Sequence, residues 1–271
     1  MILAAVALGL LIGLALGALG GGGSILTVPA LVYALGLSAQ EATTASLVIV
    51  GMTAATGSVS HARSGQTRWG SGVLLALLGV PAAVLGTQLN RAVDPDALLL
   101  CFAVVMLLAA SGMLARARAV VRAGGADSPR EPAPGATTAE VAAERSRTDL
   151  AWRLAAAGLG IGFLNGFLGV GGGFVVVPVL VVLLHMPMPS AVGTSLLVIA
   201  VNSAVALVAR AGHGSFAWSV IVPFTLAAIA GSLAGKRVAD RLRAITLTRS
   251  FAALLVVVAA YVAIKAVPAL V

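Results

Sequence analysis

The sequence is poor in charged and aromatic residues. Of its 271 residues only 10% are charged and 4% aromatic, whereas 60% are hydrophobic, with a mean hydropathy of +1.08. Soluble domains carry about a quarter charged residues, so a soluble protein is excluded because its surface could not stay hydrated. Apolar runs of about 15 to 20 residues recur along nearly the whole chain, without the ~10-residue alternation of a membrane barrel. We therefore expect an all-α polytopic membrane protein.

Cysteine and histidine are also scarce. The single Cys101 excludes a disulfide framework or a metal pair, and we interpret it as a small buried hydrophobic residue. His61, His185 and His213 are too scattered for a metal site. They lie at the ends of apolar segments, where we expect them to be solvated or interfacial, with anion attraction or titration as the alternative. No metal or cofactor is expected, and no Ser–His spacing indicates an enzyme.

The sequence contains two sets of five apolar segments. The first set comprises residues 2–19, 25–37, 41–60, 71–89 and 97–115, and the second comprises 151–169, 174–186, 190–210, 216–235 and 245–266. The stretch between them is rich in Gly, Pro, Ala and charges of both signs, a composition that cannot bury a core. We expect a membrane repeat over 1–115, a flexible cytoplasmic linker over 116–153, with a short helix near 140–147, and a second membrane repeat over 154–271. The first segment lacks the basic start of a signal peptide, so we expect it to be retained.

The two sets are copies of one sequence at an offset of 149 positions. At this single offset, without gaps, glycine, proline and tryptophan recur too often for chance. The matches include Gly9/Gly158, Gly13/Gly162, Gly17/Gly166, Gly20/Gly169, Gly22/Gly171, Gly23/Gly172, Pro29/Pro178, Ser46/Ser195, Trp69/Trp218 and Phe102/Phe251. We infer an internal duplication.

The positions of Lys and Arg indicate that the copies are inverted. If each copy crosses the membrane an odd number of times, with the N-terminus outside, the loops 61–70 and 236–249 and the linker lie on the inside. Fourteen of the seventeen basic residues then lie inside. Because cytoplasmic loops are enriched in Lys and Arg, this parity is favoured over an even number of crossings. The expected fold is two inverted repeats of about five helical segments each, an arrangement typical of secondary transporters.

Each copy contains a glycine-rich interruption, GGGGSILTVP at 20–29 and GVGGGFVVVP at 169–178. The following segment 25–37 would span roughly 20 Å as a helix, short of the ~30 Å hydrocarbon core. We expect broken or re-entrant helices, in which glycine leaves room for a ligand and the first N–H groups of a short helix attract an anion. Pro29 and Pro178 are expected in the first turn of these half-helices. The alternative is close helix packing, which we accept for Gly9, Gly13 and Gly17.

Other polar residues in the apolar segments could complete the anion's hydrogen bonds. The alternative is that small polar residues merely join helices. The candidate substrate-binding residues are Gly20, Gly21, Gly22, Gly23, Ser24, Ser46, Asn165, Gly169, Gly171, Gly172, Gly173, Thr194, Ser195 and Asn202. Glu41 could carry a proton, but Ser38 to Glu41 has the pattern of a capping box at the start of the third segment, which is the interpretation we favour.

The doubled motif resembles that of the sulfite exporter TauE/SafE family. The second copy reads Gly169-Val170-Gly171-Gly172-Gly173, then Pro178 and Leu180, then Thr194-Ser195-Leu196; the first copy has Ser24 in place of the last glycine and Ala45 in place of the threonine. The resemblance covers nearly the whole chain outside the linker. It implies export of a small anion such as sulfite, sulfoacetate or thiosulfate, coupled to an ion gradient of H+ or Na+.

We therefore expect a secondary transporter of the inner membrane that works by alternating access about a site at the two glycine breaks. A passive anion channel is the main alternative, and an intramembrane enzyme is a third. The residues do not identify the substrate or an oligomeric state.

Overall fold

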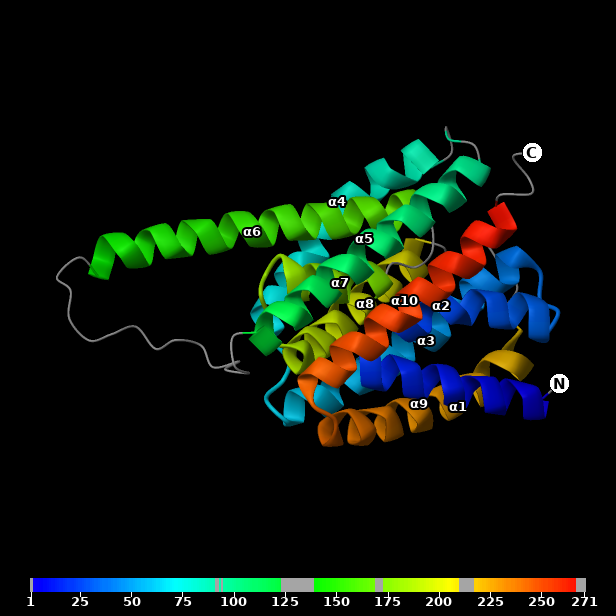
Figure 1. Ribbon diagram of the computed structural model, residues 1–271. Helices are drawn as coiled ribbons and strands as arrows, with labels where there is room; N and C mark the ends of the chain where they lie inside the picture. Colours follow the sequence, from blue (N-terminus) through cyan, green and yellow to red (C-terminus); the bar gives the residue numbers. More distant parts are fainter. Residues whose placement is uncertain are drawn as a thin grey trace.

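The computed structural model describes residues 2–90, 93, 95–122, 139–168, 173–209 and 217–266, and within these ranges all regular structure is helical (Figure 1). The first copy forms α1 (Ile2–Leu19), α2 (Gly22–Pro29), the π-helix η1 (Ala30–Ala34), α3 (Ala39–Arg63), α4 (Trp69–Asn90) and α5 (Pro95–Arg122). The second forms α6 (Ala139–Leu168), α7 (Gly173–Val182), α8 (Met188–Ala209), α9 (Trp218–Arg241) and α10 (Ala244–Ala266).

Seven of these helices are long and apolar enough to cross a membrane: α1, α3, α4, α5, α8, α9 and α10. Helices α2 and α7 have 8 and 10 residues, too few to span a ~30 Å core. The expected class, a polytopic helical membrane protein, is confirmed.

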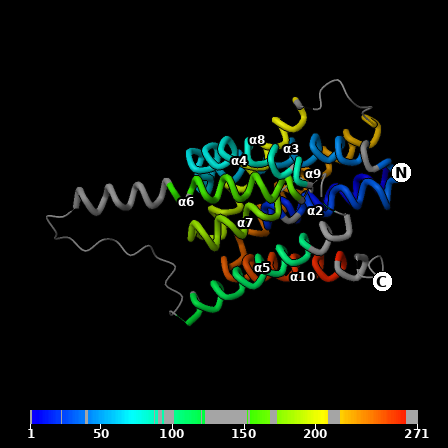
Figure 2. Tube along the Cα trace, turned by 90° about the horizontal axis from the view of Figure 1, so that it is seen from above, coloured from blue at the N-terminus to red at the C-terminus, as the bar shows by residue number. Residues whose placement is uncertain are grey.

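Apart from η1, the duplicated sequence folds into equivalent helices in the same order in both copies. Equivalent helices begin at Ala39 and Met188, at Trp69 and Trp218, and at Pro95 and Ala244, each pair 149 positions apart. The two copies do not form separate bodies, however. Helix α1 packs along α9 of the other copy and its equivalent α6 along α4, while α3 packs against α8 and α5 against α10 (Figure 2).

Glycines permit the closest of these contacts. A Cβ on Gly13 of α1 would overlap the backbone of Ala228 in α9, and one on Gly17 would overlap Ser232. In the equivalent pair, Gly162 of α6 lies against Gly79 of α4. The packing interpretation of the glycines in α1 is confirmed, because a side chain at these positions would force the helices apart.

The same contacts give the helix directions. Gly13 and Gly17 meet Ala228 and Ser232 in the same chain order, so α1 and α9 are parallel. Helices α3 and α8 are antiparallel, because Gly51 lies against Ser203 whereas Gly57 lies against Leu196.

Helix α7 lies in the core. Phe174, Val176 and Leu180 are fully buried, and Phe174 packs edge-on against Phe102 of α5 with ring centroids 5.0 Å apart. A helix that is apolar on all sides belongs in the interior. Helix α7, which follows the second glycine break, is therefore a central element of the fold.

The prediction that Pro29 and Pro178 occupy the first turn of the half-helices is wrong. Pro29 is the last residue of α2 and Pro178 is the sixth residue of α7, because the helices begin earlier, at Gly22 and Gly173. Proline has no N–H to donate to the preceding turn, and it distorts the helix. In the first copy the wider turns of η1 follow directly after Pro29, and the Ala30 N–H donates to both Leu26 and Thr27.

Both ends of the expected linker 116–153 are helical. Helix α5 continues through residue 122 and α6 begins at residue 139, whereas 123–138 lie outside the described residues. The Ala-Arg-rich end of α5 favours helix intrinsically, so the helix continues beyond the apolar run that ends at 115.

The capping interpretation of Glu41 is confirmed. The Ser38 side chain accepts a hydrogen bond from the Glu41 N–H at 3.3 Å, and the Glu41 carboxylate accepts one from the Ser38 N–H at 3.2 Å. This reciprocal pair satisfies two N–H groups at the start of α3.

Candidate substrate site at the glycine breaks

The first break is a sharp turn at Gly20 and Gly21. Helix α1 ends at Leu19, and Gly20 has φ +75°, a left-handed conformation that favours glycine. The chain then turns back, since Gly23 lies against Ile12 and Leu16 of α1. Gly22, Gly23 and Ser24 form the first turn of α2 and are not part of the unwound backbone.

The second break is described only from Gly173 onward, since Gly169, Gly171 and Gly172 lie outside the described residues. Helix α7 begins at Gly173, which is equivalent to Ser24 at the offset of 149 positions. Gly173 is buried.

The two breaks meet in the structure. A Cβ on Gly21 would overlap the carbonyl group of Gly173, and one on Gly173 would overlap the Ser24 hydroxyl. A Cβ on Gly20 would lie 2.6 Å from Ser195 Oγ of α8. The structure therefore brings together five of the predicted residues, from both copies: Gly20, Gly21, Ser24, Gly173 and Ser195.

This contact places the N-terminal ends of α2 and α7 side by side. The first N–H groups of a helix have no partner within the helix, and the helix dipole adds partial positive charge at the same end. Ser24 is 5% exposed, and its hydroxyl donates to the Gly21 carbonyl at 2.6 Å. The arrangement is suited to an anion held by backbone N–H groups.

The other predicted polar residues are more dispersed. Thr194 is fully buried, and its hydroxyl accepts a hydrogen bond from the Arg68 N–H at 3.1 Å, so it joins α8 to the α3–α4 turn. Ser46 donates to the Thr43 carbonyl of its own helix. Asn165, in the last turn of α6, and Asn202 of α8 are half-buried. Ser195, the next residue after Thr194 on α8, lies against Gly20 of the first break.

The burial of His61 and its contacts with other segments were not predicted from the sequence. The expectation that it is solvated is wrong: its side chain is 1% exposed. Nδ1 lies 2.8 Å from Gln66 Oε1, and Nε2 lies 3.2 Å from the carbonyl oxygen of Gly17, three residues before the first break. The sequence offered one signal: Gly57 lies one helical turn earlier on the same face of α3, and glycines on an apolar helix favour close packing.

A cavity of about 110 Å³ lies beside His61. Its lining includes Ala18, His61, Gln66, Val192 and Asp240, from both copies. Val192 also lies against Gly20, where an added Cβ would be 3.3 Å from the Val192 Cα. The cavity thus adjoins the first break.

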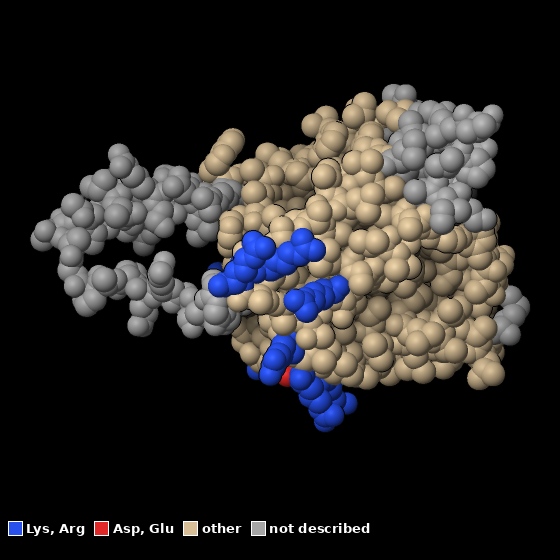
Figure 3. Space-filling view, in the orientation of Figure 1, with Lys and Arg blue, Asp and Glu red and all other residues tan. Residues whose placement is uncertain are grey.

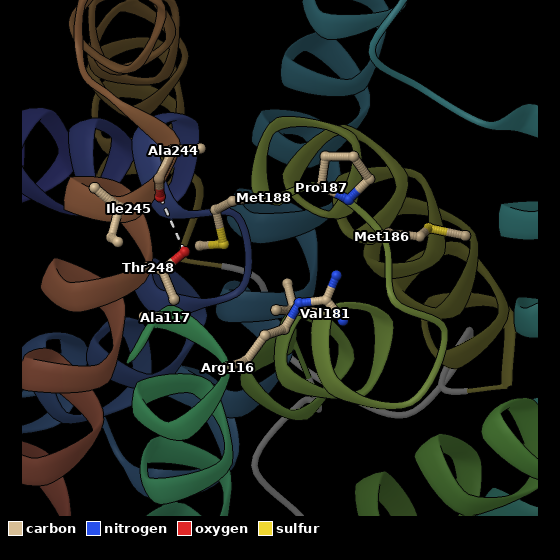
Figure 4. Close-up of a pocket in the computed structure, with 9 residues that line it drawn as sticks. All are labelled: Arg116, Ala117, Val181, Met186, Pro187, Met188, Ala244, Ile245 and Thr248. Atoms are coloured by element: carbon tan, nitrogen blue, oxygen red, sulfur yellow. Dashed lines mark hydrogen bonds between the residues drawn. The ribbon is translucent and has the colours of Figure 1, made fainter. Parts of the chain in front are cut away.

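A smaller cavity of about 40 Å³ lies between α5, α10 and the turn that joins α7 to α8 (Figure 4). Arg116, Met186 and Met188 line it, together with Thr248, whose hydroxyl donates to the Ala244 carbonyl at 2.9 Å. This cavity carries one cationic side chain among mainly apolar ones.

Basic residues gather at the end of the molecule where α3, α5 and α9 end and α4 and α10 begin, here called the basic end (Figure 3). Both cavities lie at this end, since Asp240 of α9 lines one and Arg116 of α5 the other. The described Lys and Arg residues there are Arg63, Arg68, Arg116, Arg118, Arg122, Lys236, Arg237, Arg241, Arg243 and Arg249.

The comparisons with known proteins agree with this architecture. The chain matches the family described as "Sulfite exporter TauE/SafE" over residues 5–262. It is 34% identical over 257 residues to a "Probable membrane transporter protein" of Xylella fastidiosa strain Temecula1, covering 93% of this chain and 91% of that protein. A "Probable membrane transporter protein YunE" of Bacillus subtilis strain 168 is 24% identical over 229 residues, with 79% of each chain covered. No solved structure matches the chain significantly. The match over almost the full length and the Xylella relative together show that this chain belongs to the TauE/SafE sulfite exporter family of membrane transporters.

Proposed function

We propose that the chain is a secondary transporter that exports a small anion, such as sulfite or an organosulfonate, by alternating access. The contact of Gly21 with Gly173 carries this proposal, because it joins the two copies at the N-terminal ends of two short helices. Substrate sites of transporters with internal repeats lie where the repeats meet, and helix N-termini in such sites face anionic groups. The family name supports a sulfur-containing anion.

The proposed site is built mainly from backbone. Gly20 to Ser24 would contribute from the first break, and Gly169, Gly171, Gly172 and Gly173 from the second. The Ser195 hydroxyl is the closest described polar side chain from α8. Ser46, Asn165, Thr194 and Asn202 are proposed for an outer shell that would act in other states of the transport cycle.

The helix directions support an inverted relation between the copies. Equivalent helices α3 and α8 run antiparallel, as they would if a rotation axis in the membrane plane related the two halves. The gathering of Lys and Arg at one end supports a cytoplasmic position for that end and for residues 116–153, with the protein in the inner membrane. We propose H+ or Na+ as the coupling ion, and transport without catalysis.

Flux measurements in proteoliposomes test this function. Vesicles are loaded with sulfite, thiosulfate, sulfoacetate or chloride, and anion movement is followed with and without an imposed pH gradient or Na+ gradient. We expect saturable movement of one sulfur-containing anion, driven against its own gradient by the ion gradient. Unsaturable, strictly downhill flux of all four anions would instead identify a passive channel.

A further inference from the structure

A chain of polar side chains links the two copies at the basic end. His61, in the last turn of α3, contacts Gln66 of the following turn through Nδ1. The Gln66 amide nitrogen donates to Asp240 Oδ1 of α9 at 3.4 Å, and Asp240 Oδ2 accepts from Lys236 at 2.5 Å. His61 and Gln66 belong to the first copy, and Asp240 and Lys236 to the second. We call these four residues the polar link.

The donor and acceptor roles in the polar link depend on the protonation of His61. The Gly17 carbonyl can only accept, so Nε2 of His61 must carry a proton. In this orientation the Gln66 amide has its carbonyl oxygen toward Nδ1 and its nitrogen toward Asp240, an arrangement that is satisfied only when Nδ1 donates as well. Both ring nitrogens donate only in the protonated imidazolium.

Loss of one proton would break the polar link. Nδ1 would become an acceptor facing the Gln66 carbonyl, and the amide would have to turn to restore a hydrogen bond. The turned amide would present its oxygen to the Asp240 carboxylate, where two acceptors repel. The described charged groups that face His61 are Lys236 and Asp240 on α9. Ala18, Val192 and Leu247, which line the same cavity from α1, α8 and α10, are uncharged.

Protons can reach His61 through the adjacent cavity. About 110 Å³ is enough for several water molecules, and the cavity is lined by both His61 and Asp240. Ser232 lies one helical turn before Lys236 and packs against Gly17 and Gly57. Its hydroxyl is fully buried and finds no hydrogen-bond partner within the described residues. A buried unpaired hydroxyl is costly, so we expect a water molecule to bind beside it.

We infer that His61 is a proton-binding site, and that its proton completes the polar link between the two copies at the basic end. Release of the proton then loosens this end and opens the cavity toward the first glycine break. The role of this step in coupling proton movement to anion movement rests on the proposed transport function.

Cysteine accessibility tests the proton site without requiring transport. In a Cys101→Ser background, Val192→Cys reports on the cavity, and Ser64→Cys, in the exposed turn after α3, corrects for the pH dependence of the thiol reaction. We expect maleimide labelling at 192, relative to 64, to rise by about fivefold or more between about pH 5 and pH 8. His61→Gln should remove this rise, whereas His185→Gln, at an exposed histidine after α7, should retain it.

A second variant distinguishes loss of the polar link from loss of the folded state. Gln66→Leu removes the connection to Asp240 but keeps His61, so relative labelling at 192 should be fast at both pH values in a monodisperse protein. Labelling that does not change with pH in the parent, or that rises equally in His61→Gln, would overturn the inference.

Transport then tests the coupling role. His61→Gln should exchange sulfite between equal concentrations but lose accumulation driven by a pH gradient. Undiminished accumulation in this variant would contradict the coupling role. If the parent moves no sulfite but its labelling shows the His61-dependent response to pH, the proposed substrate fails while the proton site stands.

Discussion

Gly21 and Gly173 bring two backbones into direct contact, because neither residue has a Cβ. In the first copy, the positive φ of Gly20 allows the sharp turn, and the Ser24 hydroxyl donates a hydrogen bond to the Gly21 carbonyl. At this scale the candidate site depends on the absence of side chains, and the smallest substitution should disturb it.

We predict that Gly21→Ala lowers sulfite flux by roughly tenfold or more, the rate equivalent of about 1.4 kcal/mol. The added methyl group would overlap the Gly173 carbonyl and push the ends of α2 and α7 apart. Flux in proteoliposomes at equal protein content is the measurement. Gly160→Ala is the matched control, because a Cβ there meets no atom within 4 Å. Unchanged flux in Gly21→Ala would exclude this contact from the transport mechanism.

At the scale of helices, two pairs mirror each other. Helix α1 packs along α9, and α6 packs along α4, each through a row of glycines spaced four residues apart. Gly13 and Gly162 are the equivalent central positions of these rows. The close approach of the helices maximises van der Waals contact, on which helix association in lipid depends.

We predict that Gly13→Ala and Gly162→Ala each destabilise the protein by about 1–3 kcal/mol, because the methyl group overlaps the backbone of the facing helix. Thermal unfolding in detergent should show a lower Tm for both variants. Gly160→Ala on α6, which faces open space, should keep or raise the Tm, since alanine favours helix. A fall in only one of the two variants would contradict the equivalence of the two helix pairs.

At the scale of the whole molecule, charge is unequal at the two ends. The basic end carries Lys236, the nine Arg residues named above and both cavities. Ser64 follows α3 at this end, whereas Ala34 precedes α3 at the opposite end, and both are exposed. Helix α3 has 25 residues and spans about 37 Å, long enough to cross the bilayer, so we expect the two positions to lie on opposite sides of it.

We predict that, in a Cys101→Ser background, a membrane-impermeant maleimide labels Ala34→Cys in intact cells. Ser64→Cys should be labelled only after the membrane is permeabilised, because we propose that the end rich in Lys and Arg faces the cytoplasm. The reverse pattern would invert the proposed orientation, and with it the proposed direction of export.

Much of this protein was predictable from its sequence. Hydropathy and composition depend only on local sequence, so they were sufficient to predict the membrane class and most helix positions. The offset of 149 positions identified the duplication, and the glycine clusters located the first break and the start of α7. The residue types at Ser38 and Glu41 were also sufficient to predict the capping box.

Only the tertiary structure decided which segments meet. That α1 packs on α9 of the other copy, that Gly21 lies against Gly173, and that His61 is buried against Gly17 all depend on contacts between distant parts of the chain. Such contacts follow from the fit of helix surfaces in three dimensions, and apolar segments of similar composition do not specify their partners. The sequence by itself therefore determined the elements and the breaks between them, whereas packing determined the site that those breaks form.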